Sequence, residues 1–206
     1  PTLAFSLQYL LQLLILFIPL WIFCLRKYQA TAFDFGFMKV GIWKFTSTVL
    51  SSYIFYFILT IIISSILYKE QIDLPGYRPQ ESHLPLFGTD IIGMLGATFF
   101  IVIVAPLFEE IFFRGFVYRV LVKTWSVGFG SFMSAILFAL FHFEFQSFIP
   151  LFILGLILNY NYQRTSSLWT AIGFHALNNG VAFSLEVLLY YNPGLLNELV
   201  NPLGLF

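Results

Sequence analysis

The sequence predicts an all-α fold, a polytopic transmembrane helical bundle of about six spans, on three observations. Hydrophobic residues make up 59% of the chain, whereas soluble domains contain about 45–50%. Charged residues make up 10%, against about 25% in soluble domains. The apolar residues also gather in runs that reach the length of about 18 residues expected of a membrane-spanning helix. A chain of 206 residues cannot bury so much apolar surface, so part of that surface must face lipid.

Charge and cysteine content exclude several classes of protein. Ten basic and ten acidic residues give a net charge of zero, so the chain has no basic field to hold a nucleic acid. Cys24 is the one cysteine, which rules out an internal disulfide and a Cys/His metal knuckle. The composition therefore argues against soluble, disordered and nucleic-acid-binding proteins.

Six apolar runs are the expected spans. They cover residues 3–25, 46–68, 91–118, 129–143, 148–162 and 168–191. The first run has no basic segment before it and no small-residue cleavage site after it, so a signal peptide is the weaker interpretation. Pro1 stands where an initiator methionine is expected, which indicates numbering that starts inside a longer gene product.

Residues 69–88, with three prolines and two glycines, form the long connection of the chain. We therefore expect a single membrane domain over residues 1–206. Residues 1–90 are predicted to supply an N-terminal helix pair and an outer loop. Residues 91–191 are predicted to form a four-helix core that carries the chemistry.

The basic residues of the loops predict an extracytoplasmic N-terminus. In this orientation the outer loops contain Lys69 and Arg78. The inner loops contain Arg26, Lys27, Lys39, Lys44, Arg119, Lys123 and Arg164. This distribution matches the excess of basic residues that cytoplasmic loops carry.

The first group of candidate functional residues is the segment from Glu109 and Glu110 to Arg114. Glu110 and Arg114 are four residues apart on a helix with the acid first, the better order for an ion pair. Glu109 points about 100° away around the helix, so it remains to face another partner. The structural alternative is a helix that begins at Pro106, with both acids placed near its positive end.

Two further groups lie on later spans. Phe138 and His142 are four residues apart, as are His175 and Asn179, so each pair shares one helix face. Alone, His142 is more simply an interfacial residue, whereas His175 with Asn178 and Asn179 needs partners inside the bundle.

His142 is expected near the outer end of its span and His175 nearer the inner end. We therefore expect a tilted, broken or offset helix, with Pro106 as the place for a break.

These three motifs, in this order on separate apolar spans, resemble those of the CPBP family, also called the Abi family. That family contains the type II CAAX prenyl proteases and bacteriocin-processing enzymes. The resemblance runs from about residue 105 to residue 180. The segment Arg164–Trp169 also resembles bacterial members, and the first 90 residues resemble no family that we can name.

The resemblance implies roles for the matching residues. Glu109 corresponds to the glutamate that activates water, and His142 to the histidine that holds this water. His175 and Asn179 correspond to a pair that stabilises the oxyanion. The remaining matches are structural: the ion pair Glu110–Arg114 and the packing residue Phe138.

The implied activity is hydrolysis of a peptide bond within the membrane, without a covalent intermediate. The expected partners are the lipid bilayer and a membrane-associated peptide or protein, with or without a lipid anchor, and not a nucleic acid. The resemblance implies a multi-pass integral protein of a bacterial inner membrane or an equivalent membrane.

We expect no cofactor and no metal, with a zinc metalloprotease as the second mechanism. One carboxylate and two histidines can bind zinc and leave a position open for water, but the sequence His-Glu-x-x-His is absent. Because Glu110 is committed to Arg114, few acids are expected to orient the imidazoles of a zinc site.

Two other classes of function remain open. A non-catalytic membrane partner or immunity-type protein of the same family would bind without cleaving. A proton or ion carrier would also use buried Glu and His residues, although the sequence lacks the half-repeats that transporters often show.

Overall fold

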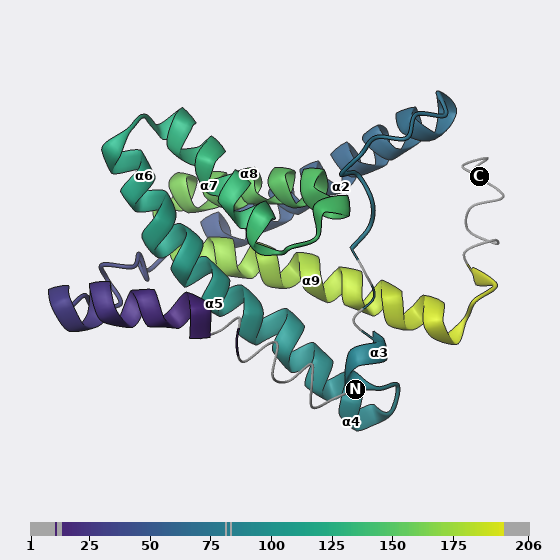
Figure 1. The fold of residues 1–206 in the computed structure, drawn as a ribbon, viewed down its shortest axis with the longest axis horizontal. Helices are drawn as coiled ribbons and strands as arrows, with labels where there is room; N and C mark the ends of the chain where they lie inside the picture. Colours follow the sequence, from purple (N-terminus) through teal and green to yellow (C-terminus); the bar gives the residue numbers. More distant parts are fainter. Residues whose placement is uncertain (1–10, 12–13, 81, 83, 196–206) are drawn as a thin grey trace.

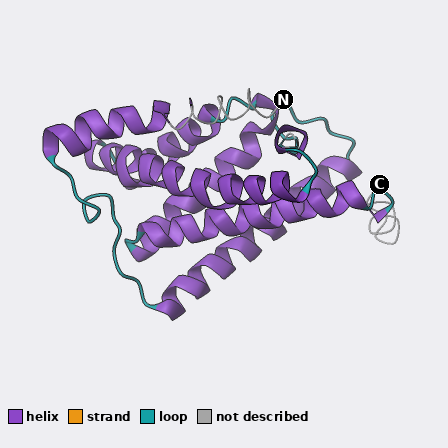
Figure 2. Ribbon diagram, turned by 90° about the horizontal axis from the view of Figure 1, so that it is seen from below, coloured by secondary structure: helices purple, strands orange, loops and turns teal. Residues whose placement is uncertain are grey.

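The structure, a computed structural model, describes residue 11 and residues 14–80, 82 and 84–195. In this part of the chain every regular element is a helix, and Figure 2 shows the helices joined by loops without a strand. The prediction of an all-α helical bundle is confirmed.

Helices of very different lengths make up the fold, as the ribbon in Figure 1 shows. The elements are η1 (Leu20–Lys27), α2 (Ile42–Lys69), α3 (Leu84–Phe87), α4 (Ile91–Ala97), η2 (Thr98–Val104), α5 (Ala105–Phe112), η3 (Phe113–Tyr118), α6 (Arg119–Thr124), α7 (Val127–Phe141), η4 (Phe145–Ser147), α8 (Phe148–Thr165) and α9 (Leu168–Tyr191).

Three of the described helices are long and apolar enough to cross a membrane: Ile42–Lys69, Ile91–Thr124 and Leu168–Tyr191. They contain the predicted spans 46–68, 91–118 and 168–191. The runs 129–143 and 148–162 correspond to the shorter helix α7 and to α8. The first run, 3–25, lies partly outside the described residues, so the total of six spans stays a prediction.

Polar side chains set the beginnings of two helices in the core. The carboxylate of Asp90 accepts a hydrogen bond from the backbone N–H of Gly93 and caps α4. The hydroxyl of Ser126 accepts one from Phe129 and caps α7. Both residues are of the types that N-cap positions favour, because their oxygens satisfy an N–H that lacks a helical partner.

The expected break at Pro106 is wrong, because the helix from Ile91 to Thr124 is continuous. Two π-helical segments, η2 and η3, lie within it. The backbone N–H of Ala105 bonds to the carbonyl of Phe100, five residues earlier. This wider turn accommodates a proline, which has no N–H and whose ring would crowd the carbonyl of a regular α-helix.

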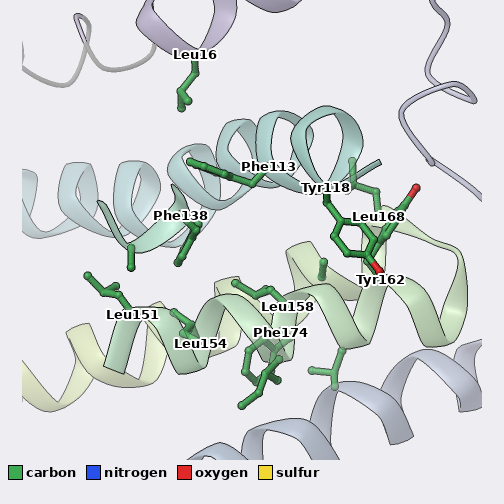
Figure 3. Close-up of a cluster of buried hydrophobic side chains, with 14 residues drawn as sticks. Leu16, Phe113, Tyr118, Phe138, Leu151, Leu154, Leu158, Tyr162, Leu168 and Phe174 are labelled. Carbon is green, nitrogen blue, oxygen red and sulfur yellow. The ribbon is translucent and has the colours of Figure 1, made fainter. Parts of the chain in front are cut away.

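The hydrophobic core lies among helices α5, α7, α8 and α9 and the π-helical segment η3. Figure 3 shows Phe113, Phe138, Leu154 and Leu158 between these helices, and Phe174 packs against Tyr56 of α2. Helices α7 and α8 approach closely at Gly155, where an added Cβ would lie 3.0 Å from the Cα of Ala135. Small residues permit such close packing of membrane helices, which fixes the frame that holds the polar residues.

Candidate active site

Glu109 lies at the centre of a buried polar cluster built from three helices. Its Oε2 atom is 3.7 Å from Nε2 of His142 and 3.9 Å from Nε2 of His175. Glu109 comes from α5, His142 caps the C-terminus of α7, and His175 lies in the second turn of α9. The structure therefore brings together three residues that the sequence placed on separate spans.

Helices α7 and α9 are offset along their axes, and this offset replaces the expected break. His142 follows the last residue of α7, whereas His175 lies close to the start of α9. Both imidazoles nevertheless reach one carboxylate oxygen. The end of α7 therefore lies beside an early turn of α9, so α9 begins further along the axis than α7 does.

The tautomer of His142 follows from its backbone contact. Its Nδ1 atom lies 2.8 Å from the carbonyl oxygen of Phe138. Because a carbonyl can only accept, Nδ1 carries the hydrogen, and in the neutral ring Nε2 is an acceptor. The ring of Phe138 packs edge-on against both imidazoles, with centroids 4.6 Å from His142 and 5.8 Å from His175. Phe138 thus holds both rings in place.

Glu110 has an environment unlike that of Glu109. Its Oε1 atom accepts a hydrogen bond from Arg114 at 2.9 Å, and both side chains are completely buried. The same oxygen lies 2.8 Å from Nδ1 of His175. The expectation that its pairing with Arg114 would leave Glu110 unable to orient an imidazole is therefore wrong. As with His142, the carboxylate partner fixes the hydrogen of His175 on Nδ1.

Asn159 of α8 is a buried polar residue that the sequence analysis missed. Its Oδ1 atom accepts a hydrogen bond from Nε of Arg114 at 3.2 Å, and its amide donates to the carbonyl of Ser131 at 2.9 Å. A second donor of Arg114 reaches the carbonyl of Gly155 at 3.0 Å. The signal in the sequence was an asparagine within the apolar run 148–162, which needs a polar partner in the bundle.

The amide of Asn179 is held by the backbone of the long helix. Its Nδ2 atom donates to the carbonyl of Ile101 at 3.0 Å. The π-helical pattern that joins Ala105 to Phe100 would next pair residue 106 with Ile101, but Pro106 has no N–H to donate. The proline therefore leaves the Ile101 carbonyl available to Asn179.

A cavity of about 1550 Å³ connects this cluster to the loop that follows α2. Helices α2 and α9, the loop residues 71–74 and 77–80 and the turn after α7 contribute to its walls. The cluster residues that line it are Glu109, His142, His175, Asn178 and Asn179. The volume exceeds the roughly 300–1000 Å³ of ordinary small-molecule pockets, so it has room for a peptide segment.

The geometry of the cluster bears on the zinc mechanism. Atoms that bind one tetrahedral zinc ion at about 2.0–2.1 Å lie about 3.4 Å from one another. The separations of 3.7 and 3.9 Å between Glu109 and the imidazoles are wider than this. Among the described residues, no group of three or more His, Cys, Asp or Glu side chains is arranged to hold a metal ion.

One oxygen of the Glu109 carboxylate has no described donor. The Oε2 atom of Glu109 is buried and accepts no hydrogen bond from a described residue. The Nε2 atoms of His142 and His175 also face this oxygen. Buried polar groups require hydrogen-bond partners, so this oxygen is available to a donor from outside the described residues.

The core of the chain matches the model of a known protein family. Residues 91–181 match the family model described as type II CAAX prenyl endopeptidase, Rce1-like. The match begins with α4 and ends two residues after Asn179, so it includes all three motifs. Comparisons with curated proteins and with solved structures gave no match. The resemblance drawn from the motifs is confirmed over this region.

Proposed function

We propose, from the Rce1-like core in residues 91–181, that the chain is a membrane-embedded endopeptidase that uses Glu109 to activate water. One observation carries the proposal: an unpartnered carboxylate oxygen faces imidazole nitrogens from two other helices. General bases need this proximity to the proton that they remove.

The first step forms the new carbon–oxygen bond. A water molecule held between Glu109 and Nε2 of His142 gives a proton to the Glu109 carboxylate while its oxygen attacks the scissile carbonyl. When the tetrahedral intermediate collapses, the carbon–nitrogen bond breaks and Glu109 returns the proton to the leaving amine. No bond forms between the enzyme and the substrate.

The second requirement is a donor set for the oxyanion. Nδ2 of Asn179 has two hydrogens, and the bond to Ile101 uses one of them. The other is free to donate to the oxyanion. His175 already directs its Nδ1 hydrogen to Glu110, so its Nε2 can donate only when the ring is an imidazolium. His175 therefore enters the step already protonated, and the carboxylate of Glu110 stabilises that imidazolium.

We propose a membrane-associated peptide as the substrate class, with or without a lipid anchor. The family description names CAAX prenyl endopeptidases, whose name refers to prenylated proteins. The cavity lies between the apolar helices α2 and α9 and is large enough for an extended segment. A substrate that lies at the membrane is therefore close to this cavity.

Proteomics of membrane peptides tests the proposal in cells. Cells with the wild-type chain are compared with cells that contain equal amounts of Glu109→Gln. A peptide that is trimmed in the first cells and remains full length in the second supports hydrolysis by Glu109. Identical peptide inventories at equal protein levels would contradict it and would favour a partner that binds without cleaving.

A further inference from the structure

The turn after α7 brings a second carboxylate to the cavity. The helix ends at Phe141, and Phe143 adopts a φ of 56°, a left-handed conformation that aromatic residues rarely take. Glu144 follows and lines the same cavity as Glu109 and His142. Unusual backbone geometry of this kind gathers at functional sites, where it directs a side chain.

Glu144 has a carboxylate oxygen without a described donor, as Glu109 has, whereas the other two acids of the cavity are paired. Its Oε2 atom is buried and accepts no hydrogen bond from a described residue. By contrast, Asp73 pairs with Arg78 at 2.5 Å. Glu186 accepts hydrogen bonds from the hydroxyl of Ser82 and from the backbone N–H of Leu84, the first residue of α3.

One oxygen of this half-buried carboxyl group is shielded from solvent and has no described donor, so a donor from outside the chain can satisfy it. An ionised carboxylate can only accept hydrogen bonds, and its strongest partners are cationic donors. The described lining of the cavity contains four acidic residues and two basic ones, Lys69 and Arg78. This balance favours a positively charged group.

The position of Glu144 relates this site to the scissile bond. Glu144 lies two positions after His142, a backbone distance of at most about 7 Å. A substrate in extended conformation advances about 3.3 Å per residue. A side chain that meets Glu144 therefore belongs to a residue close to the bond that is cut.

We propose that Glu144 forms a specificity subsite for a lysine or arginine side chain of the substrate, near the scissile bond. The inference rests on the proposed peptidase function and names the charge of its substrate. The ammonium or guanidinium group donates to Oε2 of Glu144, which supplies the missing partner.

The test measures binding separately from cleavage. The full chain with Glu109→Gln is placed in phosphatidylcholine nanodiscs, because this lipid carries no net charge that attracts cationic peptides. Short apolar fluorescent peptides contain lysine, glutamine or glutamate at one scanned position, and anisotropy gives their affinities. We expect the best lysine peptide to bind about tenfold more tightly than its glutamine counterpart, as charge-assisted hydrogen bonds allow.

Three variants on this background identify the group responsible. Glu144→Gln should reduce the lysine preference to about one, and Glu144→Lys should transfer the preference to the glutamate peptide. Glu70→Gln is the matched control, since it removes an exposed acid of the outer loop that does not line the cavity. Thermal unfolding shows that the variants are folded; Glu144→Gln should unfold no earlier than its parent.

The outcomes separate the subsite from the proposed function. No lysine preference in the parent, or a preference that persists in Glu144→Gln, would overturn the subsite. The same peptides are then given to the chain with Glu109 intact. A lysine preference without cleavage contradicts the peptidase and leaves the subsite standing. Cleavage without a lysine preference contradicts the subsite and leaves the peptidase standing.

Discussion

Glu109 and Glu110 are neighbours in the sequence but occupy different environments, because successive helix positions differ by about 100°. Glu110 points to Arg114 and His175, and these partners satisfy its Oε1 atom. Glu109 points to the cavity and has no described donor for its Oε2 atom. Glutamate therefore has a structural role at position 110 and is available for chemistry at position 109.

Glu110→Gln should destabilise the protein. The amide leaves the guanidinium of Arg114 buried without a counter-charge, at a cost on the order of 3–5 kcal/mol. Thermal unfolding in detergent should show a clearly lower midpoint than for the wild type. Glu109→Gln is the control and should unfold near the wild-type temperature, because Glu109 has no arginine partner. Equal destabilisation of both variants would mean that the two roles are wrongly assigned.

At the scale of the element, Pro106 determines more than the course of one helix. It lies in a continuous helix directly after a π-helical segment and leaves the Ile101 carbonyl to Asn179. An alanine at this position restores an N–H that competes for carbonyls of the preceding turn.

Pro106→Ala should therefore slow peptide cleavage without reducing thermal stability. Asn179→Ala should also slow cleavage, and a double variant should be hardly slower than the slower single variant. Residues that act through one hydrogen bond show such non-additive effects. The kcat/KM values of the four chains provide the measurement, and fully multiplicative effects would contradict the link.

The spacing of four residues in each motif was enough to predict which side chains share a helix face. It could not predict how the helices meet, because the π-helical turns and the offset of α7 depend on contacts between helices. Asn159 was within reach of sequence reasoning, as an amide in an apolar run. Glu144 was not, since the end of α7 and the left-handed Phe143 decide where its side chain lies.

At the scale of the whole molecule, composition was sufficient to predict a helical membrane protein but not the number of spans. Helices α7 and α8 show why: α7 has 15 residues, and α8 has 18 but becomes polar from Asn159 onward, so each apolar stretch is shorter than the roughly 20 residues that cross a bilayer. Orientation rests on the basic residues of the loops. With the predicted orientation, the loop residues 71–74 and 77–80 that line the cavity lie at the outer face.

Accessible single cysteines test this orientation. Cys24 is replaced by serine, and cysteine is introduced at the exposed positions Glu70 or Lys123. A maleimide that cannot cross the membrane should label Glu70→Cys on intact cells and Lys123→Cys only after permeabilisation. The reverse pattern would place the cavity on the cytoplasmic side.

Cleavage by purified, metal-depleted protein tests the central claim most directly. Wild-type chain and Glu109→Gln are treated with a strong chelator, placed in nanodiscs and given the same quenched peptides. We predict that the wild type cleaves at an undiminished rate and that Glu109→Gln is slower by about 10²–10⁴-fold, the range typical of a lost general base. Equal rates for the two chains, or a wild type that cleaves only after zinc is restored, would contradict hydrolysis by glutamate-activated water.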